Sequence, residues 1–201
     1  MRLRLEETKD YFEVENLIRE AFWNVYKPGC DEHFIMHQLR NDASFVSNLD
    51  YVLEVENRIV AHIVYSLGKL TKQNGDVIDA LIFGPVGVLP EHQGKGYGSY
   101  IIKETLKIAQ SLGYPCVLIT GNPKYYHRFG FETASNYHIH HQELPKDIPV
   151  FMVKVLDENK MKDFKGIYAD PQCYYVDEKD VEEFDKQFPP KIKEKRPGQL
   201  V

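Results

Sequence analysis

The sequence predicts a mixed α/β fold, in which an antiparallel first half leads into a strand–helix–strand unit. Two turn signals predict the antiparallel half: Asn57 separates two β-rich runs, and Asn74-Gly75 joins the second run to a third. An apolar run then stops at Pro90, and a glycine-rich turn leads into a helical pattern that ends at Gly113. The short run 116–119 is apolar throughout, as expected for a strand covered on both faces of a sheet.

Length and composition indicate one globular domain with additions. The chain has 201 residues, of which 43% are hydrophobic, and this is enough for a sizeable core. We expect the main domain over residues 1–157 and a C-terminal extension packed on it over 158–188. The tail over 189–201 begins with two prolines and is rich in lysine, so we expect it to be disordered.

Charge and cysteine content exclude several classes of protein. The net charge of −5 argues against a nucleic-acid-binding protein, which requires a basic face. No apolar run approaches the length that spans a membrane, and the first ten residues contain no apolar signal-peptide core. The 3 cysteines, without a C-x-x-C pair, indicate reduced thiols. We therefore expect a cytoplasmic monomer or homodimer with no nucleic-acid or membrane partner.

The N-terminal region predicts one strand and two helices. Residues 2–6 alternate apolar and polar side chains, which is typical of a strand. Thr8 is the expected N-cap of a helix that is broken at Pro28-Gly29. Its apolar face comprises Val14, Leu17, Ile18, Ala21 and Phe22. Asp31 is expected to cap a second helix that ends at Arg40. The inward residues of the second helix are Phe34, Ile35 and Leu39.

Two histidine patterns raise the question of a metal site. His33 and His37 lie four residues apart on the second helix, a spacing that can bind a metal ion. The glutamate that would follow the first histidine is absent and no third ligand is evident, so a solvated or capping pair is the better interpretation. The run 138–141 holds three histidines around one isoleucine, which indicates a strand with one polar face. The sequence therefore predicts no metal site.

Three β-rich runs form the predicted antiparallel meander. Runs 51–56 and 59–66 flank a turn in which Asn57 can adopt positive φ, and run 77–88 follows the second turn. Gly84-Pro85 interrupts this third run. Because proline cannot donate to a β-ladder, we expect a bulge or a local parting of strands there.

The C-terminal region predicts three further elements. Run 150–156 is expected to form a late strand, and residues 172–176 are a candidate for a small additional strand. Residues 177–188 predict a charged helix. The apolar stripe of this helix is Val181, Phe184 and Phe188.

The glycine-rich turn is the candidate ligand site. Gly94, Gly96 and Gly98 have no Cβ, so the backbone can curl and approach a bulky ligand. The turn opens onto a helix N-terminus, where unpaired N–H groups and the positive end of the dipole favour phosphate oxygens. Because these groups favour phosphate oxygens, a pyrophosphate is the expected ligand.

The helix after the turn has one apolar face, which comprises Ile101, Ile102, Thr105, Ile108, Ala109 and Leu112.

Spacing distinguishes three kinds of phosphate-binding loop. A P-loop requires Gly-Lys followed by Ser or Thr, whereas Gly94-Lys95 precedes Gly96. A dinucleotide fingerprint requires G-x-G-x-x-G and a downstream acidic residue, whereas the next strand ends in Thr120-Gly121. The third pattern is Q/R-x-x-G-x-G/A after a V-x-V-x-P strand, as in the GNAT superfamily of acyl-CoA-dependent N-acyltransferases. Residues 86–98, VGVLPEHQGKGYG, resemble that motif without a gap.

A second segment carries the same resemblance. Residues 122–131, NPKYYHRFGF, predict a short helix with Asn122 at the N-cap, Pro123 in the first position and Gly130 after its end. The segment is similar to the Y-x-R-x-G-F sequence that follows the fifth strand in GNAT enzymes. The resemblance covers most of the first 155 residues, and its specific motifs lie within residues 86–131.

The resemblance implies a GNAT-like acyl-CoA N-acyltransferase fold with splayed central strands. Acetyl-CoA or coenzyme A would then be the co-substrate, with the pantetheine arm held by the backbone of Val86 and Val88 in the gap between strands. The cofactor-binding residues that the resemblance implies are Val86, Val88, Gln93, Gly94, Lys95, Gly96, Tyr97, Gly98, Ser99 and Asn122.

The resemblance also implies an N-acetyltransferase in which a primary amine of a small molecule or peptide attacks the thioester directly. The backbone N–H of Val88 is, by analogy, the donor to the developing oxyanion. Tyr126 matches the position of the family's catalytic acid. A phenol, with a reference pKa of about 10, stays protonated at neutral pH and can donate to the leaving thiolate. A non-catalytic acyl-CoA-binding or regulatory module with the same fold is the alternative.

The general base and the acceptor contacts stay open. Residues 80–88 contain no carboxylate, although many GNAT enzymes use one on this strand. A water relay, or an amine that arrives already neutral, could serve in its place. The candidate side chains are Asp79, Glu54, His62 and Glu32. In GNAT-like proteins the first two helices lie beside the acceptor groove. The resulting candidates for substrate contact are Cys30, Asp31, Glu32 and His33.

Overall fold

The computed structural model describes residues 1–162 and 164–199. The chain forms two compact units. Unit 1 comprises Met1–Val64, Pro85–Ile102 and Gln172–Val201, and unit 2 comprises Tyr65–Gly84 and Lys103–Pro171. Of the extension and tail expected from the sequence, residues 163, 200 and 201 lie outside the described part of the chain.

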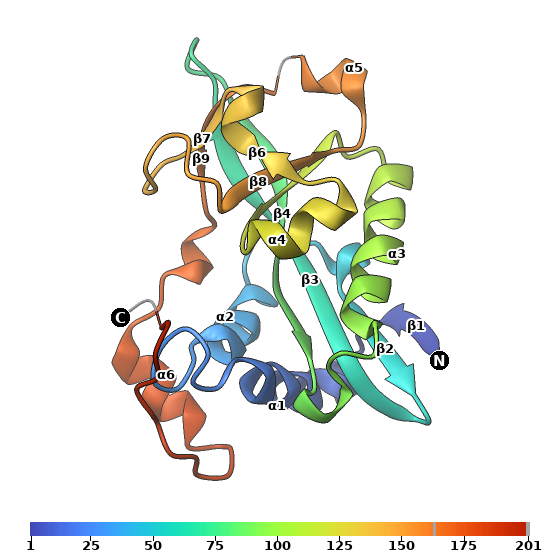
Figure 1. Cartoon of the computed structure of the whole chain (residues 1–201), viewed down its shortest axis with the longest axis vertical. Coiled ribbons are helices and arrows are strands. Elements are labelled where there is room, and N and C mark those ends of the chain that lie inside the picture. The colour runs from blue at the N-terminus through green and yellow to red at the C-terminus, as the bar shows by residue number, and fades with distance from the viewer. Residues whose placement is uncertain (163, 200–201) are drawn as a thin grey trace. The chain divides into compact units, whose positions relative to one another are not determined.

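Helices and strands alternate along most of the chain (Figure 1). In chain order the elements are β1 (Arg2–Leu5), α1 (Tyr11–Phe22), α2 (Glu32–Leu39), β2 (Tyr51–Val55), β3 (Arg58–Thr71), β4 (Val77–Val88), α3 (Tyr97–Ser111), β5 (Cys116–Thr120), α4 (Pro123–Tyr126), β6 (Glu132–Thr133), β7 (Ile139–His141), β8 (Phe151–Val155), α5 (Glu158–Met161), β9 (Gly166–Ala169) and α6 (Glu178–Asp185). The strands combine antiparallel and parallel pairing, so the predicted mixed α/β class is confirmed.

Unit 1 contains the antiparallel sheet β1-β2-β3. Leu3 of β1 pairs with Leu53 of β2, and Tyr51 of β2 pairs with Ile63 of β3. The turn between β2 and β3 has positive φ at two successive residues, which is the conformation of a type I′ hairpin. One of these residues is Asn57, so the hairpin predicted there is confirmed.

Helix α1 packs closely on the end of β4 within unit 1. Leu17 and Ile18 are buried, and a Cβ at Gly87 would lie only 2.7 Å from Cδ1 of Ile18. Glycine at this strand position therefore permits the close approach of the helix.

The start of α1 differs from the prediction. The helix begins at Tyr11, after a 3₁₀ turn over Thr8–Asp10. The capping box of that turn is formed by Glu7 and Asp10, so the prediction that Thr8 is the N-cap is wrong. Glutamate can accept the same backbone N–H as a shorter cap residue, and the sequence pattern does not distinguish the two choices.

The helix also ends before the predicted break at Pro28. It stops at Phe22, and Asn24 then adopts a φ of 59°. The backbone N–H of Asn24 donates to the carbonyl of Gly29 at 2.9 Å, and the Gly29 N–H donates to Oδ1 of Asn24 at 2.8 Å. This side chain closes the loop between α1 and α2.

Of the three side chains predicted to face inward from helix α2, only Leu39 is fully buried. Met36 and Leu39 are fully buried, whereas Phe34 and Ile35 are only half-buried. His33 is also fully buried, so its interpretation as a solvated or capping residue is wrong. The buried face of α2 differs from the face that its apolar residues predict, because α6 covers part of the helix.

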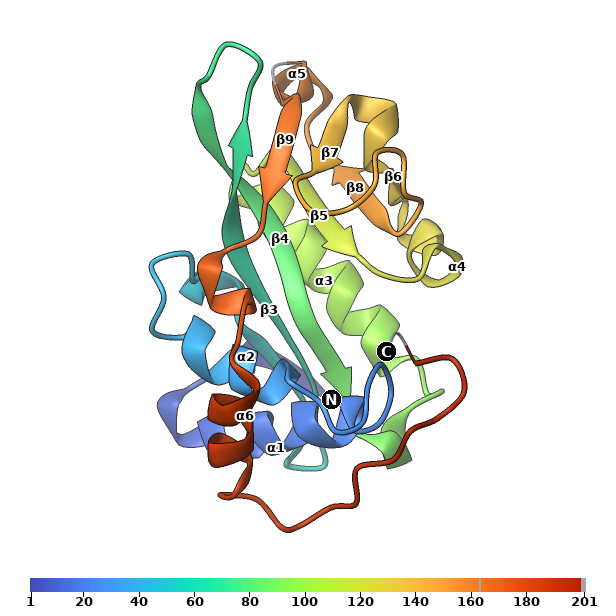
Figure 2. The same cartoon turned by 90° about the vertical axis from the view of Figure 1, so that its left-hand side faces the viewer.

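The C-terminal part of unit 1 lies along α1 and α2 (Figure 2). Helix α6 follows its N-cap Asp177, and the three residues of its predicted apolar stripe are all buried, which confirms the helix. The strand predicted over residues 172–176 is wrong, because Gln172–Tyr174 forms a 3₁₀ turn. Cys173 of that turn packs against Met36 of α2.

After α6 the chain follows α1 without regular secondary structure. The indole N–H of Trp23 and the amide Nδ2 of Asn24 both donate to the carbonyl of Ile192, at 2.9 and 3.0 Å. The backbone N–H of Glu194 donates to Oδ1 of Asn24 at 3.0 Å. Asn24 therefore forms hydrogen bonds both within the loop between α1 and α2 and with the segment after α6.

A buried ion pair connects α6 to α1. Arg19, which is fully buried, donates from Nε and Nη2 to the two carboxylate oxygens of Asp185, at 2.6 and 3.0 Å. Burial works against ionisation of Asp185, but these hydrogen bonds hold the pKa of its carboxyl below the usual range. Replacing Asp185 by alanine leaves a buried guanidinium without its partner, so we expect a loss of about 3 kcal/mol of unfolding free energy.

Urea unfolding of Asp185→Ala measures this loss, with Glu183→Ala as the matched control. Glu183 also lies on α6 and pairs with a lysine, but both side chains are exposed, so its removal should cost less than about 0.5 kcal/mol. Equal stabilities of the two variants would contradict a structural role for the Arg19–Asp185 pair.

Unit 2 has the strand order β3-β4-β5-β8-β6, and β9 pairs with both β3 and β7. At the β3–β4 turn Gly75 has a φ of 89°, and the N–H of Lys72 donates to the carbonyl of Asp76 at 2.8 Å. The hairpin predicted at Asn74-Gly75 is therefore confirmed. Strand β9 was not predicted, because it is short and begins with a glycine.

Strands β4 and β5 pair in parallel over a short stretch only. Their register joins Leu81 to Val117 and Ile82 to Leu118, and β5 then continues to Thr120. On β4, Gly84 comes two residues after Ile82 and has a φ of 151°, a conformation that residues with a side chain rarely adopt. The pairing therefore stops next to the expected interruption at Gly84-Pro85.

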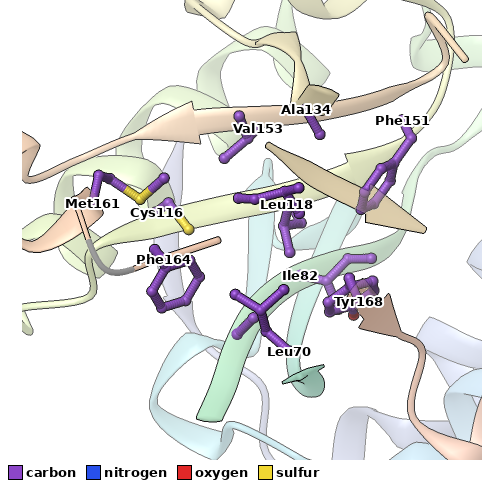
Figure 3. Packing of buried hydrophobic residues seen from close by; sticks show 12 residues of the cluster. Leu70, Ile82, Cys116, Leu118, Ala134, Phe151, Val153, Met161, Phe164 and Tyr168 are labelled. Carbon is purple, nitrogen blue, oxygen red and sulfur yellow. The ribbon is translucent and has the colours of Figure 1, made fainter. Parts of the chain in front are cut away.

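The core of unit 2 lies between its strands (Figure 3). Leucine, isoleucine and aromatic side chains from β3, β4, β5, β8 and β9 meet in one cluster. Its larger members are Leu70, Ile82, Leu118, Ile139, Phe151, Met161, Phe164 and Tyr168. Cys116 also belongs to this cluster, as expected for a packing residue on a buried strand.

The predicted apolar face of α3 is correct except at its end. Leu112 is 46% exposed, because it lies after the last helical residue and before Gly113, whose φ is 84°. The polar residue on the buried face, Thr105, bonds the hydroxyl of Tyr65 at 2.9 Å within unit 2. Among residues 1–162 and 164–199, no helix combines the length and the apolar character needed to cross a membrane.

Candidate active site

The glycine-rich loop between β4 and α3 lies in unit 1 and leaves open space at two of its glycines. Gly94 and Gly96 have φ values of 73° and 86°, and a Cβ at either position would meet nothing within 4 Å. The two glycines are therefore required by backbone conformation and face open space. The side chain of Gln93 donates to the carbonyl of Val88 at 3.1 Å and ties the loop to the end of β4.

Helix α3 begins directly after these glycines. The N–H of Tyr100 donates to the carbonyl of Gly96 at 2.9 Å, so the first helical turn starts at the loop. The N–H groups of that turn have no acceptor inside the helix, and the positive end of the helix dipole lies beside them. Lys95 is exposed on the same loop and adds a positive charge. Backbone donors, dipole and lysine together suit a diphosphate.

The end of β4 presents alternating side chains. Pro85 and Gly87 are buried, whereas Val86 and Val88 are half-buried. Gly87 faces α1, so the two valines lie on the other face of the strand. The N–H of Leu89 donates to the carbonyl of Val60 at 3.0 Å, which fixes the strand end that carries the loop.

The second predicted segment lies in unit 2 and has the expected helix signals. The side chain of Asn122 accepts a hydrogen bond from the N–H of Lys124 at 3.0 Å, and Pro123 occupies the first helical position. Gly130 ends the turn with a φ of 80°. The predicted roles of Asn122, Pro123 and Gly130 in forming this helix are confirmed.

Tyr126 lies at the end of α4 and is held by aromatic rings. Its ring centroid is 5.9 Å from the rings of Phe83 and Phe131. A Cβ at Gly121 would lie 2.4 Å from Cε2 of Tyr126, so the glycine makes room for the ring. The ring of Tyr125 stands at 87° to it. The two adjacent tyrosine rings therefore meet edge to face.

The candidate contacts on the loop between α1 and α2 have contrasting electrostatics. Burial raises the pKa of the Glu32 carboxyl to about 7 and lowers the pKa of His33 to about 4. It also raises the pKa of the Cys30 thiol, which disfavours a thiolate. Asp31 forms an ion pair with Lys27 at 2.7 Å. Glu32 is thus the member of this group with a carboxyl poised near neutral pH.

The three remaining candidates for the general base are Glu54, Asp79 and His62, and each is engaged in a salt bridge or a hydrogen bond. Glu54 pairs with Arg4 at 2.7 Å in unit 1, and Asp79 pairs with Lys69 at 2.5 Å in unit 2. His62 is fully buried, and burial lowers the pKa of its imidazole to about 4. None of these three side chains has a geometry that singles it out as the base.

Sequence analysis missed a polar group in the interior of unit 1. One ligand atom each from Glu6, Asp50 and His62 lies within 4.8 Å of the others, a spacing that could hold a metal ion. Arg40 already binds both carboxylate oxygens of Glu6, at 2.7 and 2.9 Å, and supplies a cation there. The three residues are far apart in the sequence and each lies next to apolar residues, so no local sequence pattern predicts the cluster.

Comparison with known proteins places these motifs in a family. A family model described as an acetyltransferase (GNAT) domain matches residues 2–134. An uncharacterized N-acetyltransferase of Escherichia coli, YhbS, is 25% identical over 137 residues, which are 68% of this chain and 77% of that protein.

Solved structures agree on the fold. The crystal structure of YhbS from Escherichia coli in complex with CoA has a TM-score of 0.74 and 21% identity, covering 86% of this chain and 91% of the other. A GNAT family acetyltransferase from Brucella melitensis, in complex with acetyl-CoA, has a TM-score of 0.69 and 24% identity. It covers 87% of this chain and 97% of its own.

Proposed function

The chain belongs to the GNAT acetyltransferase family, and on this premise we propose that it transfers an acetyl group from acetyl-CoA to a primary amine of a small molecule or peptide. The observation that carries the proposal is the loop at the start of α3. It combines two glycines of positive φ, open space at both, and the N–H groups of a helix N-terminus, which have no acceptor inside the helix. The structural neighbours that were crystallised with CoA or acetyl-CoA support the same co-substrate.

The proposed cofactor contacts follow the two motifs. The N–H groups from Gly94 to Ser99 would bind the diphosphate, with Lys95 adding charge, and Gln93 would fix the loop. The backbone of Val86 and Val88 would hold the pantetheine arm. Asn122, which caps α4 in unit 2, is the remaining proposed contact.

The proposed chemistry is a direct attack. The amine nitrogen forms a bond to the thioester carbonyl carbon, and the backbone N–H of Val88 donates to the developing oxyanion. The carbon–sulfur bond then breaks, and Tyr126 donates its hydroxyl proton to the leaving thiolate. The amine nitrogen also loses a proton to water, and we assign no residue to that step. The Tyr126 phenolate regains a proton from water, so the cycle balances.

One sequence feature favours the alternative of a non-catalytic acyl-CoA-binding module. Residues 80–88 contain no carboxylate, so the strand that enters the loop offers no base of its own. A catalytic chain would depend on another side chain or on water for proton removal.

Release of free thiol from acetyl-CoA across a panel of primary amines tests the proposal. The panel should include diamines, amino sugars and peptides with a free N-terminus, and calorimetry with coenzyme A should accompany it. Amine-dependent thiol release supports the acetyltransferase. Cofactor binding without turnover of any amine supports the non-catalytic module, and the absence of binding to both coenzyme A and acetyl-CoA refutes both functions.

A further inference from the structure

The interior of unit 1 contains a cluster of ionisable side chains that the proposed reaction does not use. Glu6 follows β1, Asp50 precedes β2 and His62 lies on β3. The side chains of Glu6 and His62 are fully buried, and that of Asp50 is 4% exposed. Buried charges are stable only when they are paired, so the charges of this cluster must be accounted for.

Arg40 compensates one negative charge of the cluster. Its Nε and Nη2 donate to the two carboxylate oxygens of Glu6, at 2.9 and 2.7 Å. Its Nη1 donates to Glu15 at 2.5 Å, and its guanidinium lies 4.0 Å from the ring centroid of Tyr11. One guanidinium therefore binds two other carboxylates directly, and its charge lowers the pKa of Asp50 by less than burial raises it.

His62 does not supply the missing positive charge. Its Nε2 lies 2.7 Å from Oδ1 of Asp50, which suits a neutral imidazole that donates from Nε2. Its Nδ1 is buried and has no hydrogen-bond partner among the described residues. A second proton on Nδ1 would be a buried donor without an acceptor, and burial lowers the pKa of His62 to about 4.

A carboxylate oxygen of Glu6 and one of Asp50 lie within 4.8 Å of each other in this buried site. Two carboxylates at that separation repel each other, so the pair is stable there only when one of the two holds a proton. Burial raises the pKa of Glu6 to about 7 and that of Asp50 to about 6. Because the two groups are coupled, the proton belongs to the pair.

We propose that Glu6 and Asp50 share one proton at neutral pH, and that its loss above neutral pH loosens the attachment of β1 to the rest of unit 1. The backbone N–H of Glu6 donates to the carbonyl of Asp50 at 3.0 Å, just beyond the pair Leu5–Tyr51 that ends the β1–β2 ladder. Repulsion between two buried carboxylates acts directly on this junction.

The remaining charges around the cluster do not remove the need for the proton. Asp10, on the turn before α1, faces Asp50 and raises its pKa, but it is itself paired with Arg4 at 2.5 Å. His37 on α2 lies 3.0 Å from Glu15 and is 47% exposed, so it serves that carboxylate from the solvent side.

The sign of the pH dependence follows from the raised pKa values. A carboxyl that binds its proton more tightly in the folded state contributes stability that is complete below its unfolded pKa, about 4, and is lost as pH rises through about 7. His62 has the opposite dependence, with a loss between about 6.5 and 4 as pH falls. From pH 6.5 to 8, therefore, the carboxyl pair dominates the cluster's titration.

Carbon NMR of the full chain, labelled at the side-chain carboxyls of Glu and Asp, tests the proposal. Glu6→Gln identifies the Glu6 signal, whose midpoint we expect near pH 7 in the unmodified chain. Asp50→Asn removes a neighbouring negative charge and offers Glu6 an amide donor while burial is unchanged, so the Glu6 midpoint should fall by about one pH unit. Glu54→Gln is the matched control: Glu54 pairs with Arg4 in the same unit, and its removal should leave the Glu6 midpoint in place.

Amide hydrogen exchange in β1 is the second measurement. After correction for intrinsic rates, exchange should accelerate by about tenfold between pH 6.5 and 8 in the unmodified chain and not in Asp50→Asn or Glu6→Gln. Having two variants keeps the test decisive if one of them fails to fold. Titration of both carboxyls below about pH 5, or an exchange step that persists in a folded variant, overturns the proposal.

Discussion

Replacing Gly96 by valine is expected to weaken coenzyme A binding by about a hundredfold or more while the chain stays folded. Gly96 has a φ of 86°, and a Cβ there meets no atom within 4 Å. The cost to the free protein is therefore limited to backbone strain, about 1–2 kcal/mol. The valine side chain would occupy the open space that we assign to the diphosphate, so the cost to binding is much larger.

Gly75 provides a matched control for this substitution. It lies in the hairpin between β3 and β4, with a φ of 89° and no atom within 4 Å of a built Cβ. Gly75→Val should therefore lose a similar amount of stability in urea unfolding and keep its affinity for coenzyme A in calorimetry. Wild-type affinity in Gly96→Val would contradict the assignment of the loop as the phosphate site.

The parts of the fold that the sequence predicted best depend on local backbone geometry. Asn57 and Gly75 adopt positive φ in hairpin turns, and Gly113 and Gly130 do so at helix ends. Few residue types tolerate this conformation, so their positions mark turns whatever the rest of the chain does. The glycine loop belongs to the same class, so the sequence alone indicates where the candidate site lies.

One kind of error concerns which side of a helix is covered. The apolar pattern of α2 predicts Phe34 and Ile35 as inward residues, but His33 and Met36 are the buried ones. Phe184 of α6 packs against the rings of both His33 and Phe34. The face of α2 is thus set by a helix far away in sequence, and periodicity within α2 alone carries no information about it.

The buried polar cluster shows a second limit of sequence reasoning. Glu6, Arg40, Asp50 and His62 are types that usually lie at the surface, and they come together only through the packing of β1, α2 and β3. The general base cannot be assigned from the sequence for the same reason, because burial depends on tertiary packing. Glu32 acquires its raised pKa from burial, which no spacing in the sequence predicts.

Replacing Tyr126 by phenylalanine is expected to lower turnover by about a hundredfold or more, with little change in the affinity for acetyl-CoA. The substitution removes only the hydroxyl group. The ring can keep its contacts with Phe83 and Phe131, and Gly121 still accommodates it. A loss of turnover would therefore reflect the missing proton donor rather than displaced packing. Steady-state rates with the best amine of the panel, and calorimetry with acetyl-CoA, measure the two quantities separately.

Tyr125→Phe is the matched control, because Tyr125 is the adjacent residue and its ring stands nearly perpendicular to that of Tyr126. The guanidinium of Arg128 lies 4.1 Å from the Tyr125 ring centroid, which indicates a packing role that phenylalanine can fill. Turnover in this variant should stay within about threefold of the unmodified chain. Unchanged turnover in Tyr126→Phe would remove Tyr126 from the mechanism. A large loss in Tyr125→Phe alone would move the acid to the neighbouring residue, because only the side chain that donates to the leaving sulfur should be sensitive to losing its hydroxyl.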